Sequence, residues 1–152
     1  MAGWKRGRSS ARMEKRRRPV KTLTLAADLS EIDGVRQFLR DQLQGVAISE
    51  QNFFKIELAV VEICINVIRY AYPKERASIT LSLKEGRKRV VVEVRDSGIP
   101  FNPCAAPKPD VKEIVAAGRK GGLGIYLTLQ LMDTCDYRRE DGQNVLTMIK
   151  KI

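Results

Sequence analysis

Residues 56–70 form a long apolar run that is interrupted by polar side chains at regular positions. The run reads Ile-Glu-Leu-Ala-Val-Val-Glu-Ile-Cys-Ile-Asn-Val-Ile-Arg-Tyr. Its length and spacing predict a helix, and Glu62 and Asn66, four positions apart, share one face of it. A buried carboxylate or amide needs a partner. The pattern therefore favours a helix that walls a polar cavity, with Arg69 and Tyr70 continuing the same stripe. The alternative is that Glu62 is a rim residue at the edge of the buried face.

Two glycine-containing motifs follow this helix. Residues 90–95 are rich in valine and end in Asp96-Ser97-Gly98. This pattern is either an ordinary turn after a strand or a carboxylate fixed at a strand end, beside a glycine that leaves room for a flat ligand. Residues 118–124 read Gly-Arg-Lys-Gly-Gly-Leu-Gly and precede an apolar helix expected over 125–132. Glycines before a helix let backbone N–H groups converge on an anion. The stretch fits neither a P-loop nor a dinucleotide fingerprint.

The three motifs occur in a fixed order. Asp96 follows Asn66 by 30 residues and precedes Gly122 by 26 residues. This arrangement resembles the gyrase/histidine-kinase/chaperone ATPase superfamily, and within it the small bacterial serine kinases that act as anti-sigma factors. The resemblance covers about residues 20–152. One position departs from the pattern, because Tyr70 stands where these kinases commonly carry histidine, and the chain has no histidine at all. An aromatic hydrogen-bonding ring is kept there, and any role that needs an imidazole is lost.

The resemblance implies a role for each motif residue. Glu62 would be the general base toward the attacking hydroxyl, and Asn66 the ligand of Mg²⁺. Asp96 would accept a hydrogen bond from the adenine amine, with Gly98 giving the ring clearance. The other ATP-binding residues implied are Arg69, Lys120, Gly122, Leu123 and Gly124. Residues 102–120, rich in proline and lysine, are expected to form a lid over the phosphates.

The function implied is that of an ATP-dependent protein serine/threonine kinase. It would phosphorylate an anti-sigma-factor antagonist, sequester a sigma factor and form a homodimer through its first strand and sheet edge. The alternative is a nucleotide-binding regulatory module without kinase activity. A metabolic ATPase that uses water and a nucleic-acid-binding protein that uses a basic tail account for fewer of the motifs. A sensor histidine kinase is excluded, since that enzyme phosphorylates its own histidine.

Composition fits one domain of 152 residues. The net charge of +10 is concentrated in residues 1–18, which hold eight Lys/Arg and one acidic residue, Glu14. We expect this segment to be a disordered basic tail and residues 19–152 to be the domain. The tail is either a solvated leader or the result of an upstream start, with Met13 as the real initiator. Nucleic-acid binding is not expected, because nothing in the domain extends the basic patch.

Several other sites and locations are disfavoured by the sequence. No apolar stretch reaches the roughly 18 residues of a membrane span, and no signal-peptide core is present. The three cysteines (Cys64, Cys104 and Cys135) form no close pair in the sequence and no C-x-x-C motif. A zinc site is therefore not expected, Cys64 is expected in the core, and the cysteine set indicates a reducing cytoplasm.

Patterning along the chain predicts an α+β fold. Strands are expected over 20–27, 78–84, 89–95, 135–139 and 144–149, the last two joined by Asp141-Gly142. Helices are expected from Ser30, with Asp33 completing a capping box, and from Ser49, ending before Pro73. The result is a two-layer sandwich with a mixed, mostly antiparallel sheet covered on one face by about three helices, which the resemblance identifies as a Bergerat-type, histidine-kinase-like ATPase fold.

Overall fold

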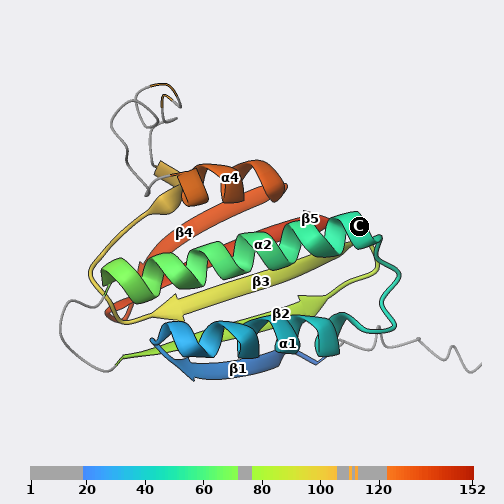
Figure 1. The fold of residues 1–152 in the computed structure, drawn as a ribbon, viewed down its shortest axis with the longest axis horizontal. Coiled ribbons are helices and arrows are strands. Elements are labelled where there is room, and N and C mark those ends of the chain that lie inside the picture. The colour runs from blue at the N-terminus through green and yellow to red at the C-terminus, as the bar shows by residue number, and fades with distance from the viewer. Residues whose placement is uncertain (1–18, 72–76, 106–109, 111, 113–122) are drawn as a thin grey trace, which may run out of the picture.

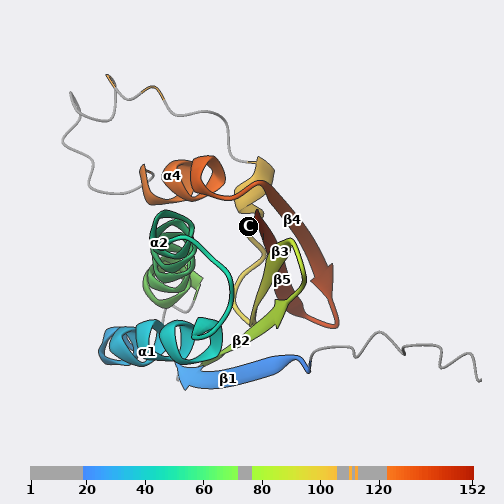
Figure 2. The ribbon, with the colours of Figure 1, turned by 90° about the vertical axis from the view of Figure 1, so that its right-hand side faces the viewer.

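A layer of helices covers one face of a β-sheet (Figure 1 and Figure 2). The computed structural model describes residues 19–71, 77–105, 110, 112 and 123–152. The strands are β1 (Lys21–Ala26), β2 (Ser78–Glu85), β3 (Arg89–Asp96), β4 (Thr134–Glu140) and β5 (Gln143–Lys151). The α-helices are α1 (Ile32–Leu43), α2 (Glu50–Asn66) and α4 (Leu123–Leu131). Shorter helical segments are the 3-10 turns η1 (Leu29–Glu31) and η3 (Pro103–Ala105) and the π-helical segment η2 (Val67–Ala71).

The sheet has five strands in the order β1-β2-β3-β5-β4. Every pairing between the described strands is antiparallel, so the expected admixture of parallel strands is not found. Two tight hairpins, β2–β3 and β4–β5, account for much of this, because a short turn can only join antiparallel strands. In the second hairpin Asp141 and Gly142 take positive φ values of 50° and 75°, as a two-residue turn of this kind requires. Strand β5 lies between β3 and β4, and its register places Asn144 opposite Asp96.

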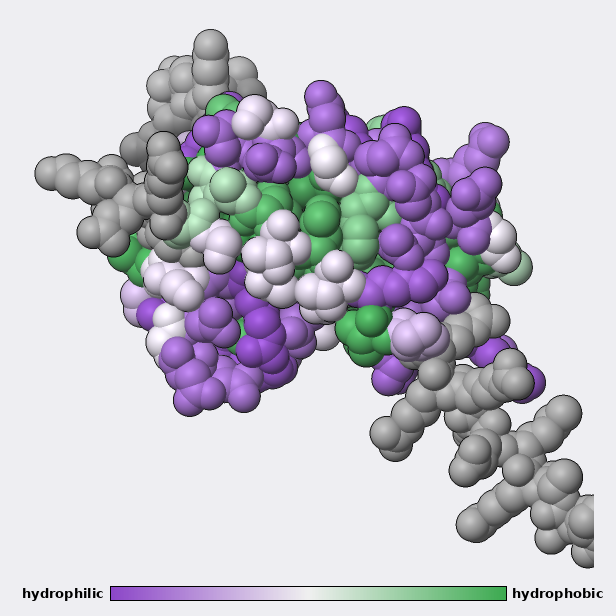
Figure 3. All heavy atoms as spheres, turned by 90° about the horizontal axis from the view of Figure 1, so that it is seen from below, coloured by the Kyte–Doolittle hydropathy of each residue, from purple (hydrophilic) through white to green (hydrophobic). Residues whose placement is uncertain are grey.

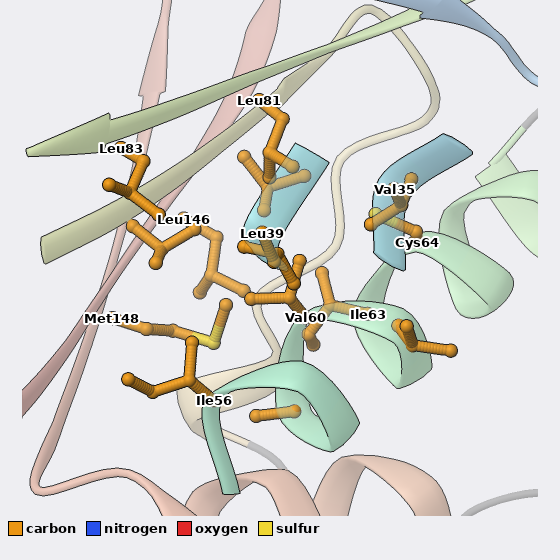
Figure 4. Packing of buried hydrophobic residues seen from close by; sticks show 14 of the residues in the cluster. Val35, Leu39, Ile56, Val60, Ile63, Cys64, Leu81, Leu83, Leu146 and Met148 are labelled. Atoms are coloured by element: carbon orange, nitrogen blue, oxygen red, sulfur yellow. The ribbon is translucent and has the colours of Figure 1, made fainter. Parts of the chain in front are cut away.

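Helix α2 is the central helix of the covering layer, between α1 and α4 (Figure 2). It begins where the sequence predicts, with the Ser49 hydroxyl accepting a hydrogen bond from the Asn52 N–H at 3.1 Å. Its buried face packs on the inner face of the sheet, where alternate strand residues are fully buried (Figure 4). The core residues labelled in Figure 4 are Val35, Leu39, Ile56, Val60, Ile63, Cys64, Leu81, Leu83, Leu146 and Met148.

The first helix begins differently from the prediction. Asp28, not Ser30, is the cap, and its carboxylate accepts a hydrogen bond from the Ser30 N–H at 2.8 Å. Residues Leu29–Glu31 then form a 3-10 turn before α1 starts at Ile32. The expected capping box at Ser30 and Asp33 is therefore wrong. Asp28 caps the 3-10 turn, and the N-cap of α1 itself, Glu31, makes no side-chain cap hydrogen bond.

Several predicted segments fall outside the residues that the structure describes. Residues 1–18, the predicted basic tail, lie outside the described residues, as does Pro73, the predicted stop after α2. Most of the predicted lid also lies outside them. Within the described ranges, no helix combines the length and the apolar character needed to cross a membrane.

Candidate functional site

A cavity of about 320 Å³ opens between α2, the β3–β5–β4 part of the sheet and the start of α4. Figure 1 shows α2 lying across this part of the sheet. Apolar walls come from the helix layer and the sheet, and they include Ile63, Val94, Ile125 and Leu146. Polar side chains line the cavity from α2, η2, β3, β4 and β5, and they are Asn66, Tyr70, Asp96, Tyr137 and Asn144. A mostly apolar cleft with a few convergent polar groups is the usual form of a small-molecule site.

Asp96 lies at the end of β3 and is only 4% exposed. Its Oδ1 accepts hydrogen bonds from the Gly98 N–H at 2.9 Å and from Asn144 Nδ2 at 3.0 Å. Both of these bonds go to the same oxygen, and Asp96 lines the cavity. The carboxylate is thus held rigidly at the strand end, as the sequence predicts. Gly98 is buried and contributes its backbone N–H to that arrangement.

Asn144 is a residue of the site that the sequence did not reveal, and Tyr137 is another. Asn144 is 6% exposed, and besides Asp96 its Nδ2 reaches the Ile99 carbonyl at 2.9 Å. Its Oδ1 accepts from the Tyr137 hydroxyl at 2.6 Å, from Arg139 at 3.0 Å and from the Phe101 N–H at 3.3 Å. Its amide therefore joins β3, β4, β5 and the segment that follows β3. In the sequence it is one asparagine near the start of a strand that also contains glutamine, threonine and lysine, so no local signal marks it.

Asn66 faces the cavity from the last residue of α2. Its Nδ2 is buried and has no hydrogen-bond partner among the described residues. A buried amide group in this state is costly unless a ligand or water completes it. The amide carbonyl is also a suitable ligand for a hard cation such as Mg²⁺. The described residues hold no cluster of three or more His, Cys, Asp or Glu side chains that could bind a metal without a ligand's help.

The other predicted residues of the helical stripe differ in burial and in whether they line the cavity. Glu62 is half-buried, one helical turn before Asn66, and is not among the residues that line the cavity. Tyr70 lines the cavity although its ring is 60% exposed. Arg69 is exposed and does not line it. The predicted stripe is thus interrupted at Arg69.

The glycine-rich motif is described only in part. Leu123 and Gly124 are the first two residues of α4, which confirms that the motif opens a helix. The first N–H groups of a helix have no partner within it and are free for an anion. Lys120 and Gly122 lie outside the described residues, so their predicted contacts stay predictions.

The acidic side chain of Asp96 also affects a neighbouring thiol in the core. Burial, with a smaller contribution from the Asp96 charge, raises the pKa of Cys64 to about 12. Cys64 is completely buried, as predicted, and stays a neutral thiol at physiological pH.

Comparison with known proteins identifies related chains. The family model described as the histidine kinase-like ATPase domain matches residues 25–150. The serine/threonine-protein kinase BtrW of Bordetella bronchiseptica is 30% identical over 96 residues, which cover 62% of this chain and 68% of that protein. The serine-protein kinase RsbW of Bacillus mycoides is 28% identical over 95 residues, covering 60% of this chain and 59% of that protein. The matched region thus spans about two thirds or less of these relatives.

Two solved structures share the fold. The RsbU and RsbW domains of a Mycobacterium tuberculosis protein match with a TM-score of 0.59 at 18% identity, over 88% of this chain and 32% of that one. The SiaB–SiaC complex from Pseudomonas aeruginosa matches with a TM-score of 0.55 at 17% identity, over 86% of this chain and 89% of that one. At these identities the likeness concerns the fold, which agrees with the predicted two-layer arrangement.

Proposed function

The chain belongs to the histidine kinase-like ATPase domain family, and from this premise we propose that it is an ATP-dependent protein serine/threonine kinase of the anti-sigma-factor type. Relatives named as serine or serine/threonine kinases support the reaction. The observation that carries the proposal is the buried carboxylate of Asp96 in an apolar cavity that also contains Asn66.

Adenine suits the inner part of this cavity. The ring is flat and apolar on its faces, and the walls at Ile63, Val94 and Leu146 are apolar. Asp96 presents a fixed carboxylate acceptor to the exocyclic amine, and a charge-assisted bond of this kind is stronger than a neutral one. Gly98 follows with no side chain of its own, which keeps the approach to the carboxylate clear.

Asn66 and the start of α4 suit the phosphate end of ATP. The amide oxygen of Asn66 is a suitable Mg²⁺ ligand, and the metal would neutralise phosphate charge when bound. The Asn66 Nδ2, which has no partner among the described residues, is a donor for a phosphate oxygen. Leu123 and Gly124 begin α4, so their backbone N–H groups are oriented for an anion. We assign Lys120 and Gly122 to the same phosphate contacts on the family pattern alone, and Arg69 to the outer rim of the site.

Glu62 is the general base of the proposed reaction. A serine or threonine hydroxyl of the protein substrate attacks the γ-phosphorus, and the bond to the bridging oxygen of ADP breaks. The hydroxyl proton passes to the Glu62 carboxylate, which lies one helical turn from Asn66 on the same face of α2.

The partners follow from the same assignment. The phosphate acceptor is an anti-sigma-factor antagonist, and the second partner is a sigma factor that the kinase holds inactive in the cytoplasm. A second copy of the chain pairs along the β1 edge of the sheet. Relatives named as serine/threonine-protein or serine-protein kinases support a protein as the substrate.

Replacement of Asp96 tests the adenine site. In Asp96→Asn the acceptor loses its charge and presents N–H groups to another donor, so ATP affinity should fall by about 100-fold. Titration calorimetry with ATP and Mg²⁺ measures it. The matched control is Asp136→Asn, an exposed aspartate on β4, which should bind like the wild type. Equal affinity for both variants would contradict the adenine assignment.

Replacement of Glu62 tests the chemistry separately. Glu62→Gln, like Glu62→Ala, should bind ATP within a few-fold of the wild type but transfer phosphate to the antagonist about 100-fold more slowly or worse. Glu50→Gln, an exposed position at the start of α2, is the matched control. Full transfer by Glu62→Gln would remove the base assignment. Wild-type protein that binds ATP yet phosphorylates no antagonist would instead be a nucleotide-binding regulatory module.

A further inference from the structure

Cys104 and Cys135 lie side by side although 31 positions separate them in the chain. Their sulfur atoms are 2.7 Å apart, and both side chains are partly buried. A disulfide bond measures about 2.05 Å, so small side-chain rotations would bring the sulfurs to bonding distance. The sequence showed no close cysteine pair, and the fold creates one.

The two thiols are held in place by the segments that carry them. The η3 turn is fixed by Asn102, whose side chain accepts from the Cys104 N–H at 2.9 Å and whose carbonyl accepts from the Ala105 N–H at 3.3 Å. Cys135 lies on β4 opposite Met148 of β5, on the inner side of the sheet. Their proximity thus follows from ordered structure on both sides.

We propose that Cys104 and Cys135 form a redox-modification site, at which a hydroperoxide converts the two thiols to an intramolecular disulfide. The inference goes beyond the proposed kinase activity and does not depend on it. Disulfides in a reducing compartment are usually transient and often serve to sense oxidants.

Two thiols and one hydrogen peroxide give one disulfide and two waters. The Cys104 sulfur attacks one oxygen of hydrogen peroxide, the O–O bond breaks, and the other oxygen leaves as water with the Cys104 thiol proton. The product is a sulfenic acid on Cys104. The Cys135 sulfur then attacks the Cys104 sulfur, the S–O bond breaks, and the Cys135 proton leaves in a second water. Burial, together with the contact to Cys104, raises the pKa of Cys135. This assigns the first attack to Cys104 and the resolving role to Cys135.

The crosslink would tie together two walls of the cavity. Pro103, next to Cys104, and Tyr137, two residues after Cys135, both line it. Because the bond closes a long loop, it also restricts the unfolded chain and should raise the melting temperature.

Peroxide oxidation of the full-length chain tests the site. After reduction, removal of reductant and treatment with one equivalent of hydrogen peroxide, the chain is unfolded and its free thiols are alkylated. Intact mass should show one adduct per oxidised chain, at Cys64, against three for the reduced chain. Peptide mapping should show a Cys104–Cys135 link. The same treatment in concentrated guanidinium chloride should form this link about tenfold more slowly.

The melting temperature gives the second readout. Oxidation should raise that of the wild type by about 5 °C and leave that of Cys104→Ser and Cys135→Ser unchanged. Three adducts after oxidation, a link that includes Cys64, or crosslinking mainly between chains would each overturn the proposal. Cys64 is the internal control, since its thiol is inaccessible in the folded protein.

Discussion

The amide of Asn144 satisfies several groups at once in the candidate nucleotide site. Its nitrogen donates to Asp96 and to the Ile99 carbonyl, and its oxygen accepts from three other groups. The described residues thus fill both donors of the amide, and its oxygen has more donors than lone pairs. Asn144 is therefore a positioning residue, which fixes the direction of the Asp96 carboxylate through a side chain that is itself immobilised.

Removal of this amide should weaken nucleotide binding without removing the acceptor. In Asn144→Ala, Asp96 keeps its charge but loses one of the two donors that orient Oδ1, so we expect ATP affinity to fall by about tenfold. Stability should fall by about 1–3 kcal/mol, since buried groups are left unpaired. Calorimetry and urea unfolding measure the two effects.

The neighbouring variant Gln143→Ala is the control for Asn144→Ala. Gln143 makes one long contact of 3.4 Å to the Ser97 hydroxyl, so its removal should change affinity little. If Asn144→Ala lowers stability and binds ATP like the wild type well below its melting temperature, Asn144 is structural only.

Asp96 could be found from the sequence and Asn144 could not, for a physical reason. Asp96 belongs to a local pattern, a valine-rich strand that ends in Asp-Ser-Gly. The position of Asn144 depends on the register between β3 and β5, whose partners lie 48 residues apart. A short turn predicts that the two strands it joins will pair with each other. It does not predict which further strand pairs with the free edge of that hairpin. Tyr137 was missed for the same reason.

At the scale of elements, α2 was the most predictable. Its cap at Ser49, its apolar periodicity and its Glu62/Asn66 face are all local features, and the structure confirms the cap and the cavity-facing position of Asn66. The strand pairs β2–β3 and β4–β5 were predictable because each is joined by a short turn. The strand order, with β5 between β3 and β4, was not predicted by any local feature.

The helix pattern failed at the end of α2, where the backbone changes its period. After Asn66 the chain forms the π-helical segment Val67–Ala71. A π-helix bonds each residue to one five positions away, so the spacing of 3.6 residues per turn no longer predicts which side chains share a face. Arg69 is exposed for this reason, and Tyr70 reaches only the mouth of the cavity. Such segments often occur at functional sites.

On the whole molecule, the two edges of the sheet differ in character. The β4 edge reads Thr-Cys-Asp-Tyr-Arg-Arg-Glu, and Arg138 pairs with Glu93 and Glu140 on its outer side. Hydrogen bonding from Arg138 lowers the pKa of Glu140, so this charge persists below the usual range of glutamate. Edge charges disfavour pairing with another strand. The β1 edge reads Lys-Thr-Leu-Thr-Leu-Ala and has a single charge.

An apolar band lies beside the β1 edge. Figure 3, which views the molecule from the side of α1 and β1, shows hydrophobic side chains between hydrophilic margins. Apolar surface rimmed by polar residues is a common feature of interaction sites. Together with the β1 edge, which has only one charged residue, it supports a second copy of the chain as the occupant.

A lysine placed on this edge should separate the proposed dimer. Thr24 is exposed on β1, and in Thr24→Lys two like charges meet across the two-fold axis of an isologous interface. We expect the dimer dissociation constant to rise by about tenfold or more, measured by sedimentation equilibrium. Thr134→Lys places the same charge on the exposed start of β4 and is the matched control, which should dimerise like the wild type. A monomeric wild-type chain would contradict the proposed dimer, and equal weakening by the two variants would contradict an interface at β1. Because neither position lines the cavity, ATP affinity should be unchanged in both variants, which separates the loss of assembly from damage to the nucleotide site.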